Sequence, residues 1–373
     1  MTVRDLVLRL HRWGGLAIGL LVAVVSLTGA ALLINLPAQQ RGADEAARVT
    51  PGEGPRVAPS ALIAAGEAAL EGRELRAAQF YADPSHAAVM HFWDEARVFV
   101  DPWTGDAFGA EETPAGSALL ERFHRSLLLS GPGTTLVGLV TVGLVVLVVF
   151  GLWLWWPGRG SIKRAFRPEV RRGWKRANYD LHNVLGFYAA ALLLVLGGTG
   201  ALMAYPGLQT LAGRAVQAVF GDGHPSGQLP AELDGVTPLP AESDRVASTP
   251  RVDRAIAHAR RLFPDATWVQ ALPARGGRPG LRILVAADRS GNASRYHTLR
   301  ADAAGDIQSL TRFGEERRVV RLNRLVGRLH TGEGMGPIYR VSAFLACVIG
   351  GLLPFSGTLI WFPRWRRRRQ RGG

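Results

Sequence analysis

The stretch RLHRWGGLAIGLLVAVVSLTGAALLI, residues 9–34, places His11 directly before a long apolar run. A second stretch, DLHNVLGFYAAALLLVLGGTGALMAY at residues 180–205, repeats this arrangement with His182. In both stretches a Thr-Gly-Ala motif follows the histidine at the same offset, beginning at Thr28 and at Thr199. An apolar run of about 20 residues can cross a bilayer as a helix. The two stretches therefore predict two membrane helices, each with a histidine at its start.

Two further apolar runs bring the number of predicted spans to four. The chain of 373 residues combines 47% hydrophobic residues with a net charge of +14, and much of the positive charge flanks the apolar runs. Topology explains that charge, so it does not indicate nucleic-acid binding. We predict a mostly α integral membrane protein. Its predicted spans are residues 13–36, 134–156, 183–205 and 341–362.

Three short basic segments predict the orientation, because Lys and Arg near span ends are retained in the cytoplasm. The segment between the second and third spans has eight Lys or Arg against two acids, and the tail has six Arg and no acid. We therefore expect a multi-pass protein of a bacterial inner membrane, with both termini cytoplasmic. The expected cytoplasmic segments are residues 1–12, 157–182 and 363–373, and the expected periplasmic connectors are residues 38–133 and 207–335.

The second and fourth spans also match each other. FHRSLLL at residues 123–129 leads to GLWLWWPGR, and LHTGEGM at residues 329–335 leads to GTLIWFPRW. His124 precedes Pro157 by the same interval as His330 precedes Pro363. The chain therefore consists of two predicted repeats. Because both begin in the cytoplasm, they are expected to be parallel, about an axis normal to the membrane.

Each connector predicts a small α+β periplasmic domain. An Ala-rich helical stretch is followed by strand-like alternation that ends in an Asp, Gly-Asp turn, VDPWTGD in the first connector and ADAAGD in the second. The second turn is one residue shorter. A segment rich in Pro, Gly and Ser, residues 222–250, is predicted to be an insertion in the second domain.

Parallel repeats place equivalent residues at equal depth, so His11 is expected to face His182, and His124 to face His330. Two histidines without Cys, Asp or Glu make a poor zinc or di-iron site, which needs three or four protein ligands. They suffice for haem, because the porphyrin supplies four nitrogens. We expect two b-type haems, each with two histidine axial ligands.

Three arginines near these histidines are candidates for binding haem propionates by charge-assisted hydrogen bonds. Arg12 has a second interpretation, as a cytoplasmic anchor for the first span. The three candidates are Arg12, Arg125 and Arg328.

The LHRWGGLAIGL, FHRSLLL, GLWLWWP and VDPWTGD segments together resemble the PepSY-associated transmembrane family, also called iron-regulated membrane proteins, over nearly the whole chain. The resemblance implies PepSY-like periplasmic domains and four haem-ligating histidines. It further implies a reductase of ferric siderophores or other iron chelates, which passes electrons from the cytoplasm through haem to the periplasm. The chain has no dinucleotide fingerprint, so we expect a separate cytoplasmic donor, such as an acidic flavodoxin, a ferredoxin or a reductase.

Two alternatives remain open at this point. A non-redox protein could use PepSY-like domains to bind or restrain a periplasmic peptidase or another partner, which would leave the four histidines without a role. A small permease for a metal or siderophore is less favoured, because the spans contain almost no charge and no interruption beyond Pro354.

Overall fold

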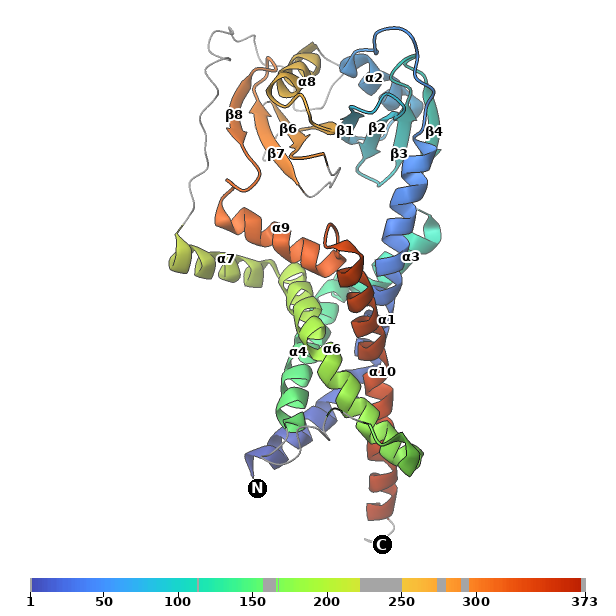
Figure 1. Ribbon diagram of the computed structural model, residues 1–373, viewed down its shortest axis with the longest axis vertical. Helices are drawn as coiled ribbons and strands as arrows, with labels where there is room; N and C mark the ends of the chain where they lie inside the picture. The colour runs from blue at the N-terminus through green and yellow to red at the C-terminus, as the bar shows by residue number, and fades with distance from the viewer. Residues whose placement is uncertain are drawn as a thin grey trace. The chain divides into compact units, whose positions relative to one another are not determined.

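A computed structural model gives the arrangement of the chain (Figure 1). Most of the predicted insertion at 222–250 lies outside the described residues, as do parts of the predicted basic segments 157–182 and 363–373. The structure describes residues 2–112, 114–156, 166, 168–221, 250–273, 280–289 and 295–369.

The chain divides into two compact units. We call them the helical unit and the sheet unit, and each is described by itself. The helical unit comprises Met1–Pro37, Ala115–Ala215 and Leu322–Gly373, and the sheet unit comprises Ala38–Pro114 and Val216–Arg321.

Among the described residues, four helices are long and apolar enough to cross a membrane, which agrees with the number of predicted spans. They extend beyond the apolar runs, because polar flanking residues continue the same helices. Val3 and Trp174 each begin a helix well before its histidine. The four helices are α1 (Val3–Ala46), α4 (Gly133–Trp155), α6 (Trp174–Ala204) and α10 (Gly336–Arg369).

Shorter helices accompany the four long ones. His124 and His330 lie on two of these helices, α3 and α9, and not on the spans themselves. The shorter elements are α3 (Ala115–Ser126), the 3-10 turn η1 (Val170–Arg172), α7 (Pro206–Phe220) and α9 (Arg318–Thr331).

The long helices pack closely where glycine removes a side chain. α6 contacts both α4 and α10. A Cβ added at Gly350 of α10 would lie 2.9 Å from Leu193 of α6, and one at Gly19 of α1 would lie 2.9 Å from Pro354. Small residues commonly bring membrane helices together in this way. α10 continues as a helix through Pro354, so this span is not discontinuous.

The sheet unit differs from the prediction of two separate domains. In the described part of this unit, eight strands form one antiparallel sheet in the order β4-β3-β2-β1-β5-β6-β7-β8. β1 pairs with β5, with Ala78 opposite Ala271 and Tyr81 opposite Trp268. Alone, each four-stranded half would expose β1 or β5 as an unpaired edge. The strands are β1 (Leu75–Tyr81), β2 (Ala88–Phe92), β3 (Arg97–Val100), β4 (Ala107–Glu111), β5 (Trp268–Pro273), β6 (Leu281–Ala286), β7 (Tyr296–Ala301) and β8 (Ile307–Thr311).

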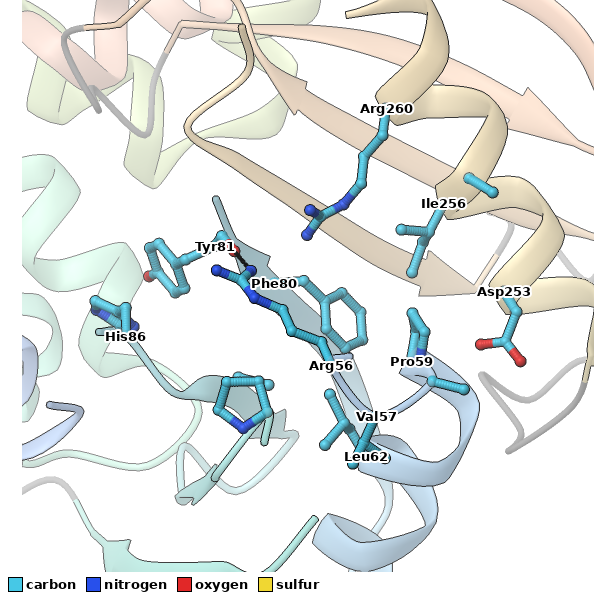
Figure 2. A pocket seen from close by; sticks show the side chains of 14 residues that line it. Arg56, Val57, Pro59, Leu62, Phe80, Tyr81, His86, Asp253, Ile256 and Arg260 are labelled. Carbon is cyan, nitrogen blue, oxygen red and sulfur yellow. Dashed lines mark hydrogen bonds between the residues drawn. The ribbon is translucent and has the colours of Figure 1, made fainter. Parts of the chain in front are cut away.

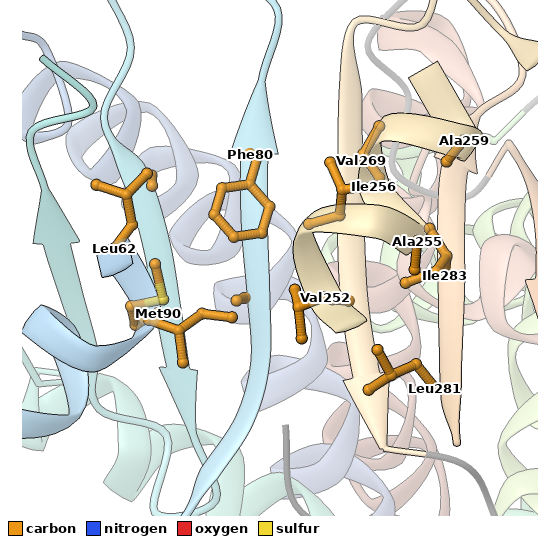
Figure 3. Close-up of a cluster of buried hydrophobic side chains, with 14 of the residues drawn as sticks. Leu62, Phe80, Met90, Val252, Ala255, Ile256, Ala259, Val269, Leu281 and Ile283 are labelled. Carbon is orange, nitrogen blue, oxygen red and sulfur yellow. The ribbon is translucent and has the colours of Figure 1, made fainter. Parts of the chain in front are cut away.

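Two helices, α2 (Pro59–Ala69) and α8 (Pro250–Leu262), pack on this sheet and against each other. Figure 3 shows the buried side chains between the helices and the strands. One apolar cluster runs across the β1–β5 seam, with Met90 from one half and Ile256 and Ile283 from the other. The continuous core therefore joins the two halves into a single folded unit.

Both predicted Asp, Gly-Asp turns join neighbouring strands. Between β3 and β4, the Gly105 amide donates to the Asp101 carbonyl at 2.9 Å. Between β7 and β8, the Gly305 amide donates to the Asp302 carbonyl at 3.2 Å. Gly105 and Gly305 have φ of +82° and +88°, a region where glycine is strongly favoured.

Gly305 also allows a close approach between the β7–β8 turn and α8. A Cβ at Gly305 would overlap the carbonyl oxygen of Arg251, whereas a Cβ at Gly314, with φ of +92°, meets nothing within 4 Å. We expect Gly305→Ala and Gly314→Ala to share a conformational cost of about 1–2 kcal/mol. Gly305→Ala should lower the melting temperature further, because it adds the overlap. Thermal melts of the two full-length variants test this, and equal melting temperatures would contradict it.

Candidate functional site: two facing histidine pairs

The structure brings together all four histidines singled out from the sequence, in two pairs within the helical unit. The first pair is His11 of α1 and His182 of α6, whose ring centroids lie 6.5 Å apart with an angle of 82° between the planes. The second pair is His124 of α3 and His330 of α9, at 6.2 Å and 42°. Each pair takes one histidine from each half of the sequence.

Backbone carbonyls determine which ring nitrogen carries the proton. Nδ1 of His11 lies 3.0 Å from the Leu147 carbonyl oxygen. Nδ1 of His124 lies 3.0 Å from the Val25 carbonyl, and Nδ1 of His330 lies 3.1 Å from the Leu196 carbonyl. A carbonyl oxygen only accepts, so Nδ1 must donate in each neutral ring. Nε2 is left with a lone pair, which is the form that binds a metal.

Hydroxyl groups supplement these acceptors. The Thr28 hydroxyl donates to the Val24 carbonyl at 2.8 Å, and its oxygen lies 3.1 Å from Nδ1 of His124. Thr199 has the same relation to His330, also at 3.1 Å. Because Thr28 gives its only proton to its own helix, its oxygen accepts from the imidazole.

His182 reaches its helix neighbour through a serine. The Ser356 hydroxyl donates to the Leu353 carbonyl at 2.8 Å, so its oxygen accepts from Nδ1 of His182 at 2.7 Å. All four histidines therefore have Nδ1 protonated. Within the described part of the chain, no Nε2 atom of the four has a hydrogen-bond partner.

A glycine lies beneath each imidazole ring. A Cβ added at Gly29 or at Gly200 would lie 3.0 Å from Cε1 of His124 or His330. A Cβ at Gly151 would lie 3.2 Å from Cε1 of His11, and one at Gly357 would lie 3.4 Å from Cε1 of His182. The missing side chain lets each ring reach the helix backbone, and a larger residue would press on the ring.

The ring spacing fits two histidines bound to one metal ion from opposite sides. Metal–imidazole bonds are about 2.0–2.1 Å long, and a ring nitrogen lies roughly 1.1 Å from the ring centre, so two such rings place their centroids roughly 6.3 Å apart. The observed values of 6.5 Å and 6.2 Å bracket that distance.

Each pair offers two nitrogen ligands and no more. Among the described residues, no group of three or more His, Cys, Asp or Glu could hold a metal ion. A zinc site requires three or four protein ligands. The arrangement instead suits a metal whose remaining positions are filled by its own macrocycle, so the residues present fit a haem with two axial histidines.

The three candidate arginines have different surroundings. Arg125 is exposed and forms an ion pair with Glu121 at 3.0 Å. Arg328 donates to the Glu333 carbonyl at 3.4 Å and to the Gly334 carbonyl at 3.2 Å. Arg12 stacks on the Trp13 ring at 5.5 Å, and its buried Nε has no hydrogen-bond partner. Of the three, Arg12 is the one with a buried donor that has no partner, and it lies next to His11 in the sequence.

The sequence contains a signal for some of the residues that contact the imidazole rings, although it does not assign them a role. Thr28 and Thr199 were visible as a motif recurring at a fixed offset after one histidine of each repeat, and Gly151 and Gly357 recur at a fixed offset after the other. The spacing does not show their role, because each residue supports the other histidine of its half. Thr28, for example, follows His11 at the repeated offset but contacts His124. Ser356 has no such periodic signal.

Comparison with known proteins gave two results. A family model described as the PepSY-associated TM region matches residues 8–364. The "Uncharacterized protein PA4219" of Pseudomonas aeruginosa is 34% identical over 139 residues, which cover 37% of this chain and 34% of that protein. The chain thus matches about a third of the length of this relative.

Proposed function

Because this chain belongs to the family described as the PepSY-associated TM region, and because its four histidines form two facing pairs, we propose that it is a haem-containing membrane reductase. Its proposed substrates are ferric iron chelates, including ferric siderophores, on the periplasmic side. The observation that carries the proposal is the pair geometry, with Nε2 free in four rings whose Nδ1 atoms are held by neighbouring helices.

The four histidines would hold two haems through their Nε2 atoms, one haem for each pair. Bound haem supplies reversible one-electron transfer at iron. The protein's own contribution is to fix each imidazole in one tautomer and one orientation. Hydrogen bonds to the second ring nitrogen act in this way at metal sites generally. Arg12, near the first pair, is the arginine best placed to receive a propionate.

The two pairs are separated along the membrane helices. On α1, Thr28 contacts His124 of the second pair. The helix from His11 to Thr28 spans about 26 Å at the rise of roughly 1.5 Å per helical residue. His182 and Thr199 have the same separation on α6. This distance is close to the roughly 30 Å thickness of the apolar core of a bilayer. Electrons passed between the two pairs would therefore cross most of the membrane.

The basic segments give the proposed electron path its direction across the membrane. We place both termini in the cytoplasm, which puts the first pair near the cytoplasmic face, and we place both long connectors in the periplasm. The two halves are then parallel repeats. A cytoplasmic donor, such as a flavodoxin-like or ferredoxin-like protein or a reductase, gives one electron. Periplasmic Fe(III) accepts it and becomes Fe(II), which hard oxygen chelators hold less tightly.

The deciding experiment is spectroscopic. The detergent-purified protein should contain two b-type haems per chain by pyridine haemochrome. After stoichiometric reduction with dithionite, it should be reoxidised by a ferric chelate such as ferric citrate, with Fe(II) trapped by a chromogenic chelator. A colourless protein that also fails to take up added haem would overturn the proposal. Bound haem that ferric chelates do not reoxidise would refute the substrate class alone.

The paired geometry predicts a selective loss of haem. In His182→Ala the first pair keeps only His11, so its haem should be lost, while His124 and His330 retain theirs. The haemochrome count should fall from two to one per chain. His124→Ala should give the complementary single-haem protein, with a different reduction potential. Loss of both haems, or of neither, in both variants would show that the pairs are wrongly assigned.

The glycine contacts predict a second selective effect. Gly200→Val places a side chain against His330 and should reduce occupancy of the second pair alone. Gly198→Val is the matched control, because a Cβ at Gly198 meets nothing within 4 Å, and two residues of helix turn it about 200° away from Gly200. Haem content of the two variants, normalised to protein, tests the difference. Equal haem content would mean that Gly200 does not position the imidazole.

A further inference from the structure

A cavity of about 230 Å³ opens in the sheet unit where its two halves meet (Figure 2). One side is formed by the segment before α2 and by the start of α2 itself. The end of β1, the start of β2 and the turn after β3 contribute a second side, and α8 the third. None of these residues belongs to the proposed electron path.

Arg56 presents a fixed positive charge to this cavity. Its guanidinium donates to the Tyr81 carbonyl at 2.7 Å and to the Ala82 carbonyl at 2.9 Å. It also lies over the ring of Trp103, 5.4 Å from the centroid. Carbonyls and an aromatic face orient the guanidinium but do not neutralise it, because neither carries a full negative charge.

Arg260 brings a second positive charge from the last turn of α8. Figure 2 shows its side chain extending from the helix toward Arg56. Burial of the guanidinium and, second, the charge of Arg56 lower the pKa of Arg260. Among the described residues neither arginine forms an ion pair with a carboxylate. Two like charges facing one cavity create a positive potential that favours an anion.

Among the described lining residues, one carries a carboxylate, and both of its oxygens accept hydrogen bonds from Ser60. Asp253 of α8 accepts from the Ser60 amide at 2.7 Å and from the Ser60 hydroxyl at 2.6 Å. It thereby caps the first turn of α2, where a negative charge also complements the helix dipole. Asp253 links α8 to α2 and keeps its negative charge, but among the described residues it forms no ion pair with Arg56 or Arg260. The described lining therefore carries two arginine charges against one carboxylate charge.

Most of the remaining lining is apolar or aromatic. Phe80, Leu62 and Ile256 contribute apolar surface, and Tyr81 stacks on His86 with their centroids 3.7 Å apart. Burial, and then the charge of Asp44, raise the pKa of Tyr81 to about 12, so its hydroxyl stays neutral. The cavity therefore combines a cationic end with an apolar wall. Its volume is below the range of roughly 300–1,000 Å³ that is typical of drug-sized ligands, so it suits a smaller molecule.

We propose that this cavity binds a small organic carboxylate, with the carboxylate between Arg56 and Arg260 and an apolar stem against Phe80 and Ile256. Arginine suits this ligand because its planar fork matches a carboxylate. The ligand chemistry has two sources, a free small acid or the C-terminal carboxylate of a peptide. Carboxylate binding at this cavity does not require haem, so its test is independent of the test of the proposed reductase.

Calorimetric titration of the full-length protein in detergent tests the site with two matched probes. Phenylacetate carries a carboxylate on an apolar stem, and phenylacetamide has nearly the same shape without the charge. Phenylacetate should bind at least tenfold more tightly, because charge-assisted hydrogen bonds are the stronger kind. The peptide Ala-Ala-Phe, as free acid and as C-terminal amide, distinguishes the sources: tighter binding of the peptide acid than of phenylacetate indicates a peptide terminus.

Arg260→Gln is the decisive variant, because Arg56 also holds backbone carbonyls and its loss could unfold the unit. Arg260→Gln should weaken phenylacetate binding at least tenfold and leave phenylacetamide unchanged. Arg261→Gln removes the same charge from the neighbouring position of α8, outside the cavity lining, and should leave both unchanged. The proposal is overturned if phenylacetate shows no binding up to about 10 mM, near the weak limit for a ligand of this size. Equal weakening by Arg260→Gln and Arg261→Gln would also overturn it.

Discussion

The hydrogen bond from each imidazole Nδ1 to a neighbouring helix is the interaction on which the histidine pairs depend. A helix carbonyl already accepts from the amide four residues on, but it has a second lone pair. A side chain at the residue four positions later would normally shield this second lone pair. Here the later residue is glycine, at Gly29 for the Val25 carbonyl and at Gly151 for the Leu147 carbonyl. The glycine exposes the carbonyl and makes room for the ring.

These bonds also link pairs of helices. His11 ties α1 to α4, and His124 ties α3 to α1. His182 and His330 make the corresponding links among α6, α10 and α9. Every imidazole is thus oriented by its own half of the sequence, while its partner ring belongs to the other half. A ligand bound between the rings would join two frameworks that are each already ordered, so little orientation would remain to be fixed on binding.

The sequence was sufficient for features that depend on local composition and spacing. Apolar length located the four spans, and equal offsets paired His11 with His182. Features that depend on contacts between distant segments were not accessible. The Gly29 contact requires knowing that α3 packs on α1, and nothing local to Gly29 says so. The merging of the two sheet halves has the same cause, because each half alone reads as a complete small α+β domain and only the pairing of β1 with β5 joins them.

That pairing has a chemical consequence in the sheet unit. In the helical unit, equivalent positions of the two halves meet, so the histidine pairs are made of like residues. The cavity of the sheet unit joins positions that are not equivalent, since Arg56 precedes α2 whereas Arg260 lies in the last turn of α8. Asp253 is likewise used on one side only, as a cap for α2. Histidines that correspond in the sequence face each other in the two pairs, whereas the cavity lies where the edges of the two sheet halves join. The asymmetry places two arginines at this junction against one carboxylate, which pairs with Ser60 and with neither arginine.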